Sequence, residues 1–210
     1  MLYRDMMVLQ AWFSPAFPIG AFSYSHGLET AIQEGLVSEK ASLTRWISYL
    51  LTDGSGWNDS LFLKAAYEKS EGANDLCISF CSSEERYKET IELGAAFTRS
   101  VNSSYKMKLE HGLAYPVAVG LAAREYNLDL QLTIQSYLQA FAANLISVGV
   151  RTIPIGQQAG QDCLASLFTV IEHMKNDLIK ADLKWLGSAT FMSEVMSMKH
   201  EKANPRIYRT

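Results

Sequence analysis

Helical periodicity runs through almost the whole of this 210-residue chain, and it limits the possible folds more than any other feature. Apolar residues recur at steps of three and four in most segments. The clearest series lies in residues 130–150 and consists of Ile134, Leu138, Phe141, Leu145 and Val148. We find neither the period-two alternation of a half-buried strand nor a repeat at solenoid spacing. The sequence therefore predicts an all-α protein, a single-domain helical bundle of about eight to ten helices.

Composition agrees with one globular domain. Hydrophobic residues make up 48% of the chain and charged residues 20%, which suits a sizeable buried core. Two long uncharged stretches, residues 6–28 and 130–150, contain prolines or many polar side chains and are poor membrane spans. A net charge of −3 gives no basic field for nucleic acid, and three cysteines favour a reducing compartment. We expect a cytoplasmic, soluble protein that binds neither nucleic acid nor a membrane.

Caps and helix breakers divide the chain into segments. Gly35 is a candidate left-handed cap that ends one helix, and Ser38 is a candidate N-cap for the next. Residues 204–210 are expected to form a flexible tail beyond a helical domain of residues 1–203. The longer helices are expected over residues 1–13, 20–34, 39–51, 57–69, 83–107, 116–125, 130–150 and 154–173, with short ones at 182–185 and 191–200.

The stretch from Trp12 to Glu29, WFSPAFPIGAFSYSHGLE, combines a rigid entry with a helix of unusual composition. Its two prolines keep the residues before them extended, so the predicted helix begins near Gly20. On that helix Tyr24 belongs to the apolar face, while His26 and Glu29, three residues apart, can meet on the surface. The stretch fits either a buried first helix with a fixed entry angle or a surface that docks another protein.

Sequence patterns of common catalytic sites are absent. No glycine is followed by lysine, which excludes a Walker A loop, and there is no G-x-S-x-G elbow. His200 and Glu201 are followed by Asn204 where a zinc-protease motif needs its second histidine. Cys77 and Cys81 supply half of a tetrahedral metal site at best, so buried free cysteines are the simpler interpretation. We expect no catalytic residue, no resident metal and no cofactor.

Three residues near the end of the long helix are candidates for contacts between helices or between chains. Gln157 and Gln161 are four residues apart beside glycines, a pattern that allows close helix packing within or between chains. Arg151 fits either the dipole of the helix that it ends or a salt bridge to a partner.

The last residues form a basic segment on an acidic body. Residues 199–210 hold four basic residues against one acid, a net charge of +3, which leaves −6 for the remainder. The tail contains residue types that anchor interfaces, namely Arg206, Tyr208 and Arg209. Such a segment is either a frayed end or one that orders when a partner binds.

The alternative to an interaction protein is a helical enzyme or cofactor-binding protein that uses His26 or His111. His26 could form an acid–base pair with Glu29. No nucleophile or metal motif lies nearby in the sequence, so a structural or docking pair is the simpler interpretation.

Three separated blocks resemble the urease accessory protein F family. They are SPAFPIGAFSYSHGLE at 14–29, RTIPIGQQAGQ at 151–161 and MSMKHEKANPRIYRT at 196–210, so the resemblance runs from the first helix to the last residue. The chain departs from the family pattern at Lys199, where arginine is expected, and at Gln158 and Ala159, which replace a Thr-containing step.

The resemblance implies a non-catalytic, all-helical cytoplasmic protein. Members of the family bridge urease accessory protein D, also called H, and the GTPase accessory protein G, and together these deliver nickel to apo-urease. They form homodimers, and their C-terminal tail is implicated in binding protein D/H. By motif, the expected partner-facing or dimer-forming residues are Tyr24, His26, Glu29, Arg151, Gln157, Gln161, Arg206 and Arg209, to which we add Tyr208 of the same tail.

Overall fold

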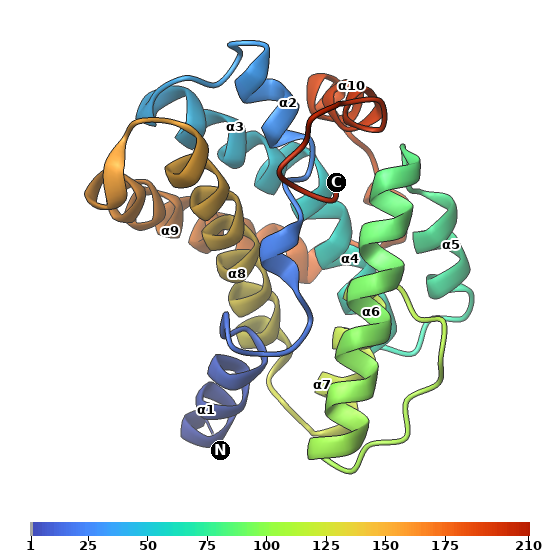
Figure 1. The fold of residues 1–210 in the computed structure, drawn as a ribbon. Coiled ribbons are helices and arrows are strands. Elements are labelled where there is room, and N and C mark those ends of the chain that lie inside the picture. Colours follow the sequence, from blue (N-terminus) through green and yellow to red (C-terminus); the bar gives the residue numbers. More distant parts are fainter. Residues whose placement is uncertain (1) are drawn as a thin grey trace.

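The computed structural model describes residues 2–210 and confirms the all-α prediction. Over this range the chain forms ten α-helices and two short 3-10 helices, without a strand (Figure 1). None of these helices has an apolar run long enough to cross a membrane. The α-helices are α1 (Leu2–Trp12), α2 (Leu28–Gln33), α3 (Lys40–Asp53), α4 (Ser55–Tyr67), α5 (Ala73–Ser79), α6 (Glu84–Ser104), α7 (Tyr115–Glu125), α8 (Leu130–Thr152), α9 (Gly156–Lys180) and α10 (Phe191–His200), and the 3-10 helices are Ala21–Ser23 and Leu183–Trp185.

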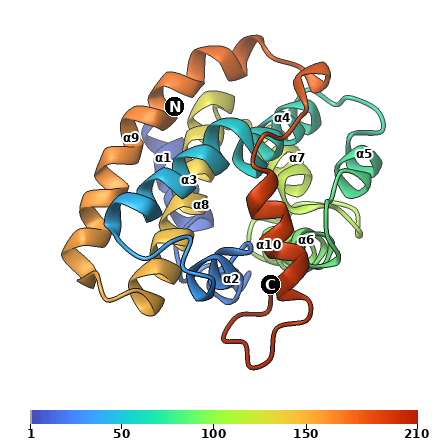
Figure 2. The same cartoon turned by 90° about the horizontal axis from the view of Figure 1, so that it is seen from above.

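Helix α4 is the centre of the molecule. All of its residues from Asn58 to Ala66 are buried, because α7 packs along it and α3 and α8 contact it as well. Seen from above, α3 and α9 lie at one side of the molecule and α5, α6 and α7 at the other (Figure 2). The close contact between α4 and α7 requires glycine at position 120, because a Cβ there would lie 2.2 Å from the carbonyl oxygen of Leu63. Helix α4 thus joins the two sides.

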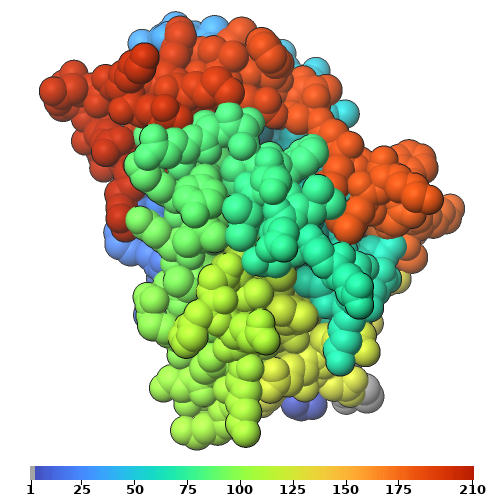
Figure 3. Space-filling model, turned by 90° about the vertical axis from the view of Figure 1, so that its right-hand side faces the viewer, coloured from blue at the N-terminus to red at the C-terminus, as the bar shows by residue number. Residues whose placement is uncertain are grey.

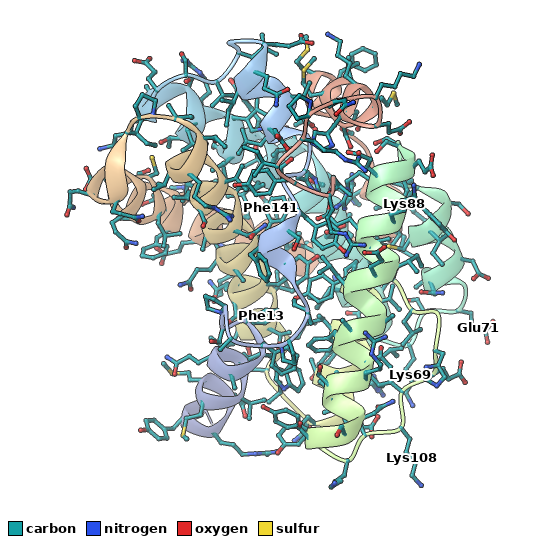
Figure 4. The ribbon with its side chains drawn as sticks, viewed as in Figure 1. Phe13, Lys69, Glu71, Lys88, Lys108 and Phe141 are labelled. Atoms are coloured by element: carbon teal, nitrogen blue, oxygen red, sulfur yellow. The ribbon has the colours of Figure 1, made fainter. Side chains whose placement is uncertain are left out.

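The apolar series predicted for residues 130–150 faces the core on α8, as expected. Its buried members are Ile134, Leu138, Leu145 and Val148. Phe141 is half-buried, and it lies with Phe13 between α8 and α6 (Figure 4). Their rings pack edge-on, Phe141 against His26 with centroids 5.1 Å apart and Phe13 against Tyr137 at 6.0 Å.

The helix predicted from Gly20 to Glu34 is wrong in its first half. The chain forms a 3-10 turn at Ala21–Ser23, becomes extended, and passes through two left-handed residues, His26 (φ 58°) and Gly27 (φ 75°), before α2 begins. A side chain at Gly27 would collide with α10, since a Cβ there would lie 2.8 Å from the backbone nitrogen of Ser197. The close approach of α10 therefore favours glycine at this break.

Other helix bounds also differ from the prediction: α4 begins at Ser55 and ends at Tyr67, α6 ends at Ser104, and α5 (Ala73–Ser79) was not predicted. Glu39, rather than Ser38, caps α3: its side chain accepts from the backbone N–H of Ser42, whose hydroxyl accepts in return from the N–H of Glu39. Helix α9 continues past the expected end near His173 as far as Lys180, because its apolar face stays buried through Met174 and Leu178. The predicted left-handed cap at Gly35 is confirmed by its φ of 76°.

The backbone freed by the break in residues 21–27 bonds to the C-terminal tail. The N–H of Ser25 donates to the carbonyl of Thr210 at 2.8 Å, and the N–H of Arg209 donates to the carbonyl of Ser23 at 2.8 Å. Tyr208 and Thr210 are buried, so the tail is docked in the structure rather than loose. Figure 3 shows the C-terminal part, in red, against the green helices of the middle of the chain. A separate tail that orders when a partner binds stays a prediction.

Candidate partner-binding site

Glu29 holds the backbone of the tail. This carboxylate lies in the first turn of α2 and is 2% exposed. It accepts hydrogen bonds from the N–H groups of Ile207 at 2.8 Å and Tyr208 at 3.0 Å, and it lies 2.9 Å from Nε2 of His200. Burial alone would raise the pKa of Glu29, but the hydrogen bonds from His200 and the two tail amides outweigh burial and hold that pKa below its usual value. The carboxylate therefore joins α2, α10 and the tail.

His200, at the end of α10, lies between two carboxylates. Its side chain is fully buried, with Nε2 facing Glu29 and Nδ1 2.9 Å from both oxygens of Glu85 on α6. Because carboxylates only accept, both ring nitrogens donate, which describes a charged imidazolium. Burial acts to lower the pKa of His200, but the hydrogen bonds to Glu85 and Glu29 raise it above its ordinary value. Arg206 adds a second cation 3.2 Å from Glu85, and we call Glu29, Glu85, His200 and Arg206 the tail clamp.

The outer part of the tail is held by Glu92 on α6. Arg209 approaches Glu92 at 2.9 Å, and the Tyr24 hydroxyl donates a short hydrogen bond to the same carboxylate. Burial and the neighbouring Glu92 raise the pKa of Tyr24, so its hydroxyl remains a donor. On the opposite side the guanidinium of Arg151 lies 5.0 Å from the ring of Tyr208. Side chains from three separate parts of the sequence thus enclose the tail.

A hollow of about 470 Å³ separates part of the tail from α6. Charged side chains of both signs line it: Glu84, Glu85, Glu92, Glu201, Lys88, Arg206 and Arg209. Lys88 projects from the upper part of α6 (Figure 4). The side chains of Arg206 and Arg209 are 46% and 63% exposed, although the backbone beside them is held. The docked tail therefore presents its charges to solvent.

A second buried network lies around Arg86 on α6. Its guanidinium lies 3.0 Å from Glu89 and 3.6 Å from Asp59 on α4. It also lies 2.9 Å from Nδ1 of His26. Because a guanidinium has no acceptor, Nδ1 of His26 accepts from it, and Nε2, 2.6 Å from the Ser55 hydroxyl, carries the ring proton.

We call His26, Ser55, Asp59, Arg86, Glu89 and Tyr137 the core network. The Tyr137 hydroxyl donates to Asp59 at 2.8 Å. Burial acts to raise the pKa of Glu89, but Arg86 outweighs it and lowers that pKa to about 2. At Asp59 burial dominates and raises the pKa. The Thr210 hydroxyl donates to Glu89 at 3.3 Å and so links the core network to the end of the tail.

The structure brings most of the predicted interface residues to one region. Tyr24, His26, Glu29, Arg151, Arg206, Tyr208 and Arg209 all lie around the docked tail. The expected surface pair of His26 and Glu29 is wrong, because both side chains are buried and each bonds within a different network. Gln157 and Gln161 lie apart, exposed in the first turns of α9. The partner contacts expected of these nine residues stay predictions.

Sequence reasoning missed the acidic face of α6. Glu85, Glu89 and Glu92 follow one another at steps of four and three, which places them on one helix face. That spacing was available in the sequence and could have revealed a carboxylate face. The cationic partners of Glu85 and Glu92, namely His200 and Arg209, lie more than a hundred positions away, and no spacing rule connects residues at that separation.

The histidines and cysteines of the described residues do not gather around a point. Within residues 2–210, no group of three or more His, Cys, Asp or Glu side chains has the arrangement to hold a metal ion. Cys77 is buried and Cys81 half-buried, and burial raises the pKa of both thiols, which disfavours the thiolate that binds soft metals. His111 is exposed on the loop before α7, whereas His26 is buried in the core network.

Comparison with known proteins points to the same family as the three sequence blocks at residues 14–29, 151–161 and 196–210. A family model described as UreF matches residues 37–168. A protein named urease accessory protein UreF from Ruegeria pomeroyi is 39% identical over 212 residues, covering 99% of this chain and 97% of its own. Urease accessory protein UreF 1 of Brucella anthropi is 38% identical over 98% of this chain and 94% of its own. UreF of Cereibacter sphaeroides strain KD131 is 41% identical over 98% of each. The chain therefore belongs to the UreF family of urease accessory proteins.

Proposed function

We propose that this protein is a non-catalytic adaptor in urease maturation. It bridges urease accessory protein D/H and the GTPase accessory protein G during GTP-dependent nickel insertion into apo-urease. Membership in a family of urease accessory proteins supports the general role. The observation that carries the finer proposal is the convergence of the family-matched residues on the docked tail. There a held backbone offers exposed arginines and a mixed-charge hollow to an acidic or amphipathic partner surface.

The protonation chemistry of the site favours binding over catalysis. An acid–base residue needs a ring nitrogen within reach of substrate. Both nitrogens of His200 already face carboxylates, and both nitrogens of His26 face Arg86 and Ser55. The rival function, a helical enzyme or cofactor-binding protein built on His26 or His111, therefore gains no support at His26. Metal analysis and an absorption spectrum of the purified protein test it directly.

The adaptor would act by preferring one nucleotide state of the GTPase. A protein shifts a partner's equilibrium only by binding its two states with different affinity. We propose that the tail surface binds accessory protein D/H, and that a homodimer presents two copies of it in the cytoplasm. The exposed amides of Gln157 and Gln161 are candidates for the contact between copies.

Reconstitution with purified components tests the proposal. Apo-urease, accessory proteins D/H and G, nickel, bicarbonate and GTP are combined with and without this chain, and urease activity is measured. We expect activation to fall strongly without the chain. Equal activation in its absence would rule the role out.

Two variants then separate the surfaces. Arg206→Glu with Arg209→Glu should abolish capture of protein D/H while the helical body remains folded, since the two side chains are 46% and 63% exposed and pair only with Glu85 and Glu92 beside the tail. Gln157→Glu with Gln161→Glu should lower the mass measured by light scattering and leave capture of D/H by the monomer detectable. Unchanged behaviour of both variants would reject these surface assignments.

A further inference from the structure

A hollow of about 430 Å³ lies between α8, α6 and the segment of residues 13–22. Figure 1 shows this segment, in blue, running between α8 and α6. At the outer side of the hollow Phe22 is 64% exposed, and Phe13 and Phe17 are half-buried. Aromatic rings from three parts of the chain line it, namely Phe13, Phe17, Phe22, Tyr115, Tyr137 and Phe141. The hollow is therefore an aromatic surface that is open to solvent.

The wall of the hollow on α8 consists of small side chains. Ser136, Ala140, Ala143 and Ser147 follow one another at steps of four, three and four, which places them on one helix face. Each of them is half-buried or exposed. At a rise of 1.5 Å per residue, Ser136 and Arg151 lie about 22 Å apart along α8. A surface of this length suits a segment of a protein chain better than a compact small molecule.

Arg151 lies at the end of this helix face and forms no ion pair among residues 2–210, whereas both tail arginines do. Its Nε donates to the carbonyl of Ser147 at 3.1 Å, and its Nη2 donates to the carbonyl of Phe22 at 3.3 Å. The backbone of two residues that line the hollow thus orients the guanidinium at its edge. A guanidinium has five N–H groups, so this exposed cation still has donors to offer.

The exposed walls of the hollow carry no acid that could pair with Arg151 of another copy. Residues 9–22 and 130–151 contain neither aspartate nor glutamate. The acids that line the hollow, Asp59 and Glu89, are buried beside Arg86. A second copy that packed this face against itself would leave both Arg151 side chains without a counter-charge. The face therefore fits a different protein that brings a carboxylate.

We propose that the α8 face, by which we mean the hollow together with Arg151, docks a segment of accessory protein D/H in which a large apolar side chain lies close to a carboxylate. The apolar side chain enters the hollow and packs against the aromatic rings. The carboxylate accepts two parallel hydrogen bonds from Arg151. The choice of D/H rests on the proposed function, because Arg151 also lies against Tyr208 of the tail that we assign to that partner.

Photocrosslinking from the α8 face identifies its occupant. The full chain, with p-benzoylphenylalanine in place of Phe22, is irradiated with purified D/H, with purified protein G, and alone. We expect an adduct with D/H whose crosslinked peptide, sequenced by mass spectrometry, carries an aspartate or glutamate near the attachment point. The same probe in place of Phe80, which is 41% exposed on α5, is the control and should not give that peptide. An adduct with protein G or with a second copy instead of D/H would overturn the inference.

Two variants connect binding to the two parts of the α8 face. Arg151→Glu should weaken binding of D/H at least about tenfold in biolayer interferometry, and replacing the crosslinked carboxylate of D/H by lysine should restore it. Ala143→Phe fills the hollow from α8 without contacting the tail and should weaken binding about as much. Arg45→Glu, the same charge reversal at an exposed arginine on α3, is the matched control and should change binding less than about threefold. Far-UV circular dichroism checks that each variant is folded.

Undiminished binding of D/H by both Arg151→Glu and Ala143→Phe would overturn the inference, and so would a crosslinked peptide without a carboxylate. If only the tail variants at Arg206 and Arg209 lose D/H, the adaptor proposal stands and the α8 face is not part of the contact. If the unmodified chain does not bind D/H at all, both the α8 face and the bridging role are rejected. Reconstituted urease activation then still tests the role in maturation by itself.

Discussion

The tail clamp and the core network bury the same kinds of side chain but obtain their positive charge differently. In the tail clamp the buried cation is the imidazolium of His200, between Glu29 and Glu85. In the core network the buried cation is the guanidinium of Arg86, and His26 beside it accepts from that guanidinium through Nδ1. One charge can be removed by a change of pH, and the other is permanent.

This difference matches what each network holds. The core network connects α4 and α6 with the break at residues 24–27, all parts of the body. The tail clamp holds a seven-residue segment in which Tyr208 and Thr210 are buried and the other residues are exposed. A permanent charge suits a contact on which folding depends, whereas a titratable one suits a segment whose release leaves the body intact. Variants that remove each charge test this comparison.

Removing the charge of Arg86 should have the largest effect. Arg86→Met leaves Glu89 and Asp59 buried without their cation, and breaking a buried pair in this way lowers the free energy of unfolding by about 3–5 kcal/mol. Urea denaturation followed by tryptophan fluorescence measures it. The matched control on the same helix is Lys88→Met, which removes an exposed ion pair with Glu84 and should leave the midpoint unchanged. Equal midpoints for the two variants would contradict a structural role for the core network.

Removing the charge of Glu29 should release the tail and spare the body. Glu29→Gln loses the ion pair with His200 and can no longer accept from both tail amides, which weakens docking by about 1–3 kcal/mol. Hydrogen exchange at the amides of Ile207 and Tyr208 should accelerate accordingly, and trypsin should cleave faster after Arg206. Glu34→Gln, which removes an exposed pair with Lys199, is the control. If global unfolding shifts as much as tail exchange does, the two networks are not separable in the way we describe.

The two regions also differ in how far the sequence could predict them. Local signals located α8 with its apolar face, the cap at Gly35, and α10 from Phe191 to His200. The same signals failed from Gly20 to Gly27, because a distant segment decides that conformation: the tail supplies backbone partners and α10 leaves no room for a side chain. Helical periodicity cannot reveal contacts with a segment almost two hundred positions away.

The candidate site shows the same limit. Resemblance of three blocks identified Tyr24, Arg151 and the tail arginines, which do gather in space. The carboxylates that hold them, Glu85 and Glu92, belong to no block and were missed. Residue type and spacing suggested that His26 and Glu29 form one pair, yet the left-handed backbone at His26 turns the two side chains into different networks.

Raising the pH should loosen the tail and leave the core network unchanged. His200 has a raised pKa, so its stabilisation is complete below the unfolded value of about 6.5 and is lost as the pH rises through the higher folded value. Glu29 has a lowered pKa, so its contribution is present above about 4.3 and is lost only as the pH falls through the lower folded value. The tail is therefore held most firmly between these limits.

Hydrogen-exchange protection of the Ile207 and Tyr208 amides, corrected for intrinsic exchange, measures how firmly the tail is held between pH 6 and 9. The aromatic NMR signals of Tyr137, in the core network, serve as the internal reference and should not move with the tail, since Arg86 stays charged throughout. His200→Gln should remove the pH dependence. Protection of these amides that rises with pH in the unmodified protein would contradict stabilisation of the tail by protonated His200.

The smallest effect should come from Arg151, which touches the tail from the opposite side to the clamp. Its guanidinium lies 5.0 Å from the ring of Tyr208 and donates to the carbonyl of Phe22 at 3.3 Å. At an exposed site a cation–π contact is worth about 0.5–1 kcal/mol, so Arg151→Met should raise exchange at Tyr208 by less than about tenfold. Arg151→Lys keeps the charge but loses the planar guanidinium, so exchange at Tyr208 should lie between that of the unmodified protein and that of Arg151→Met. An Arg151→Met effect as large as that of Glu29→Gln would mean that the tail is held equally from both sides, and that the buried clamp is not the dominant contact.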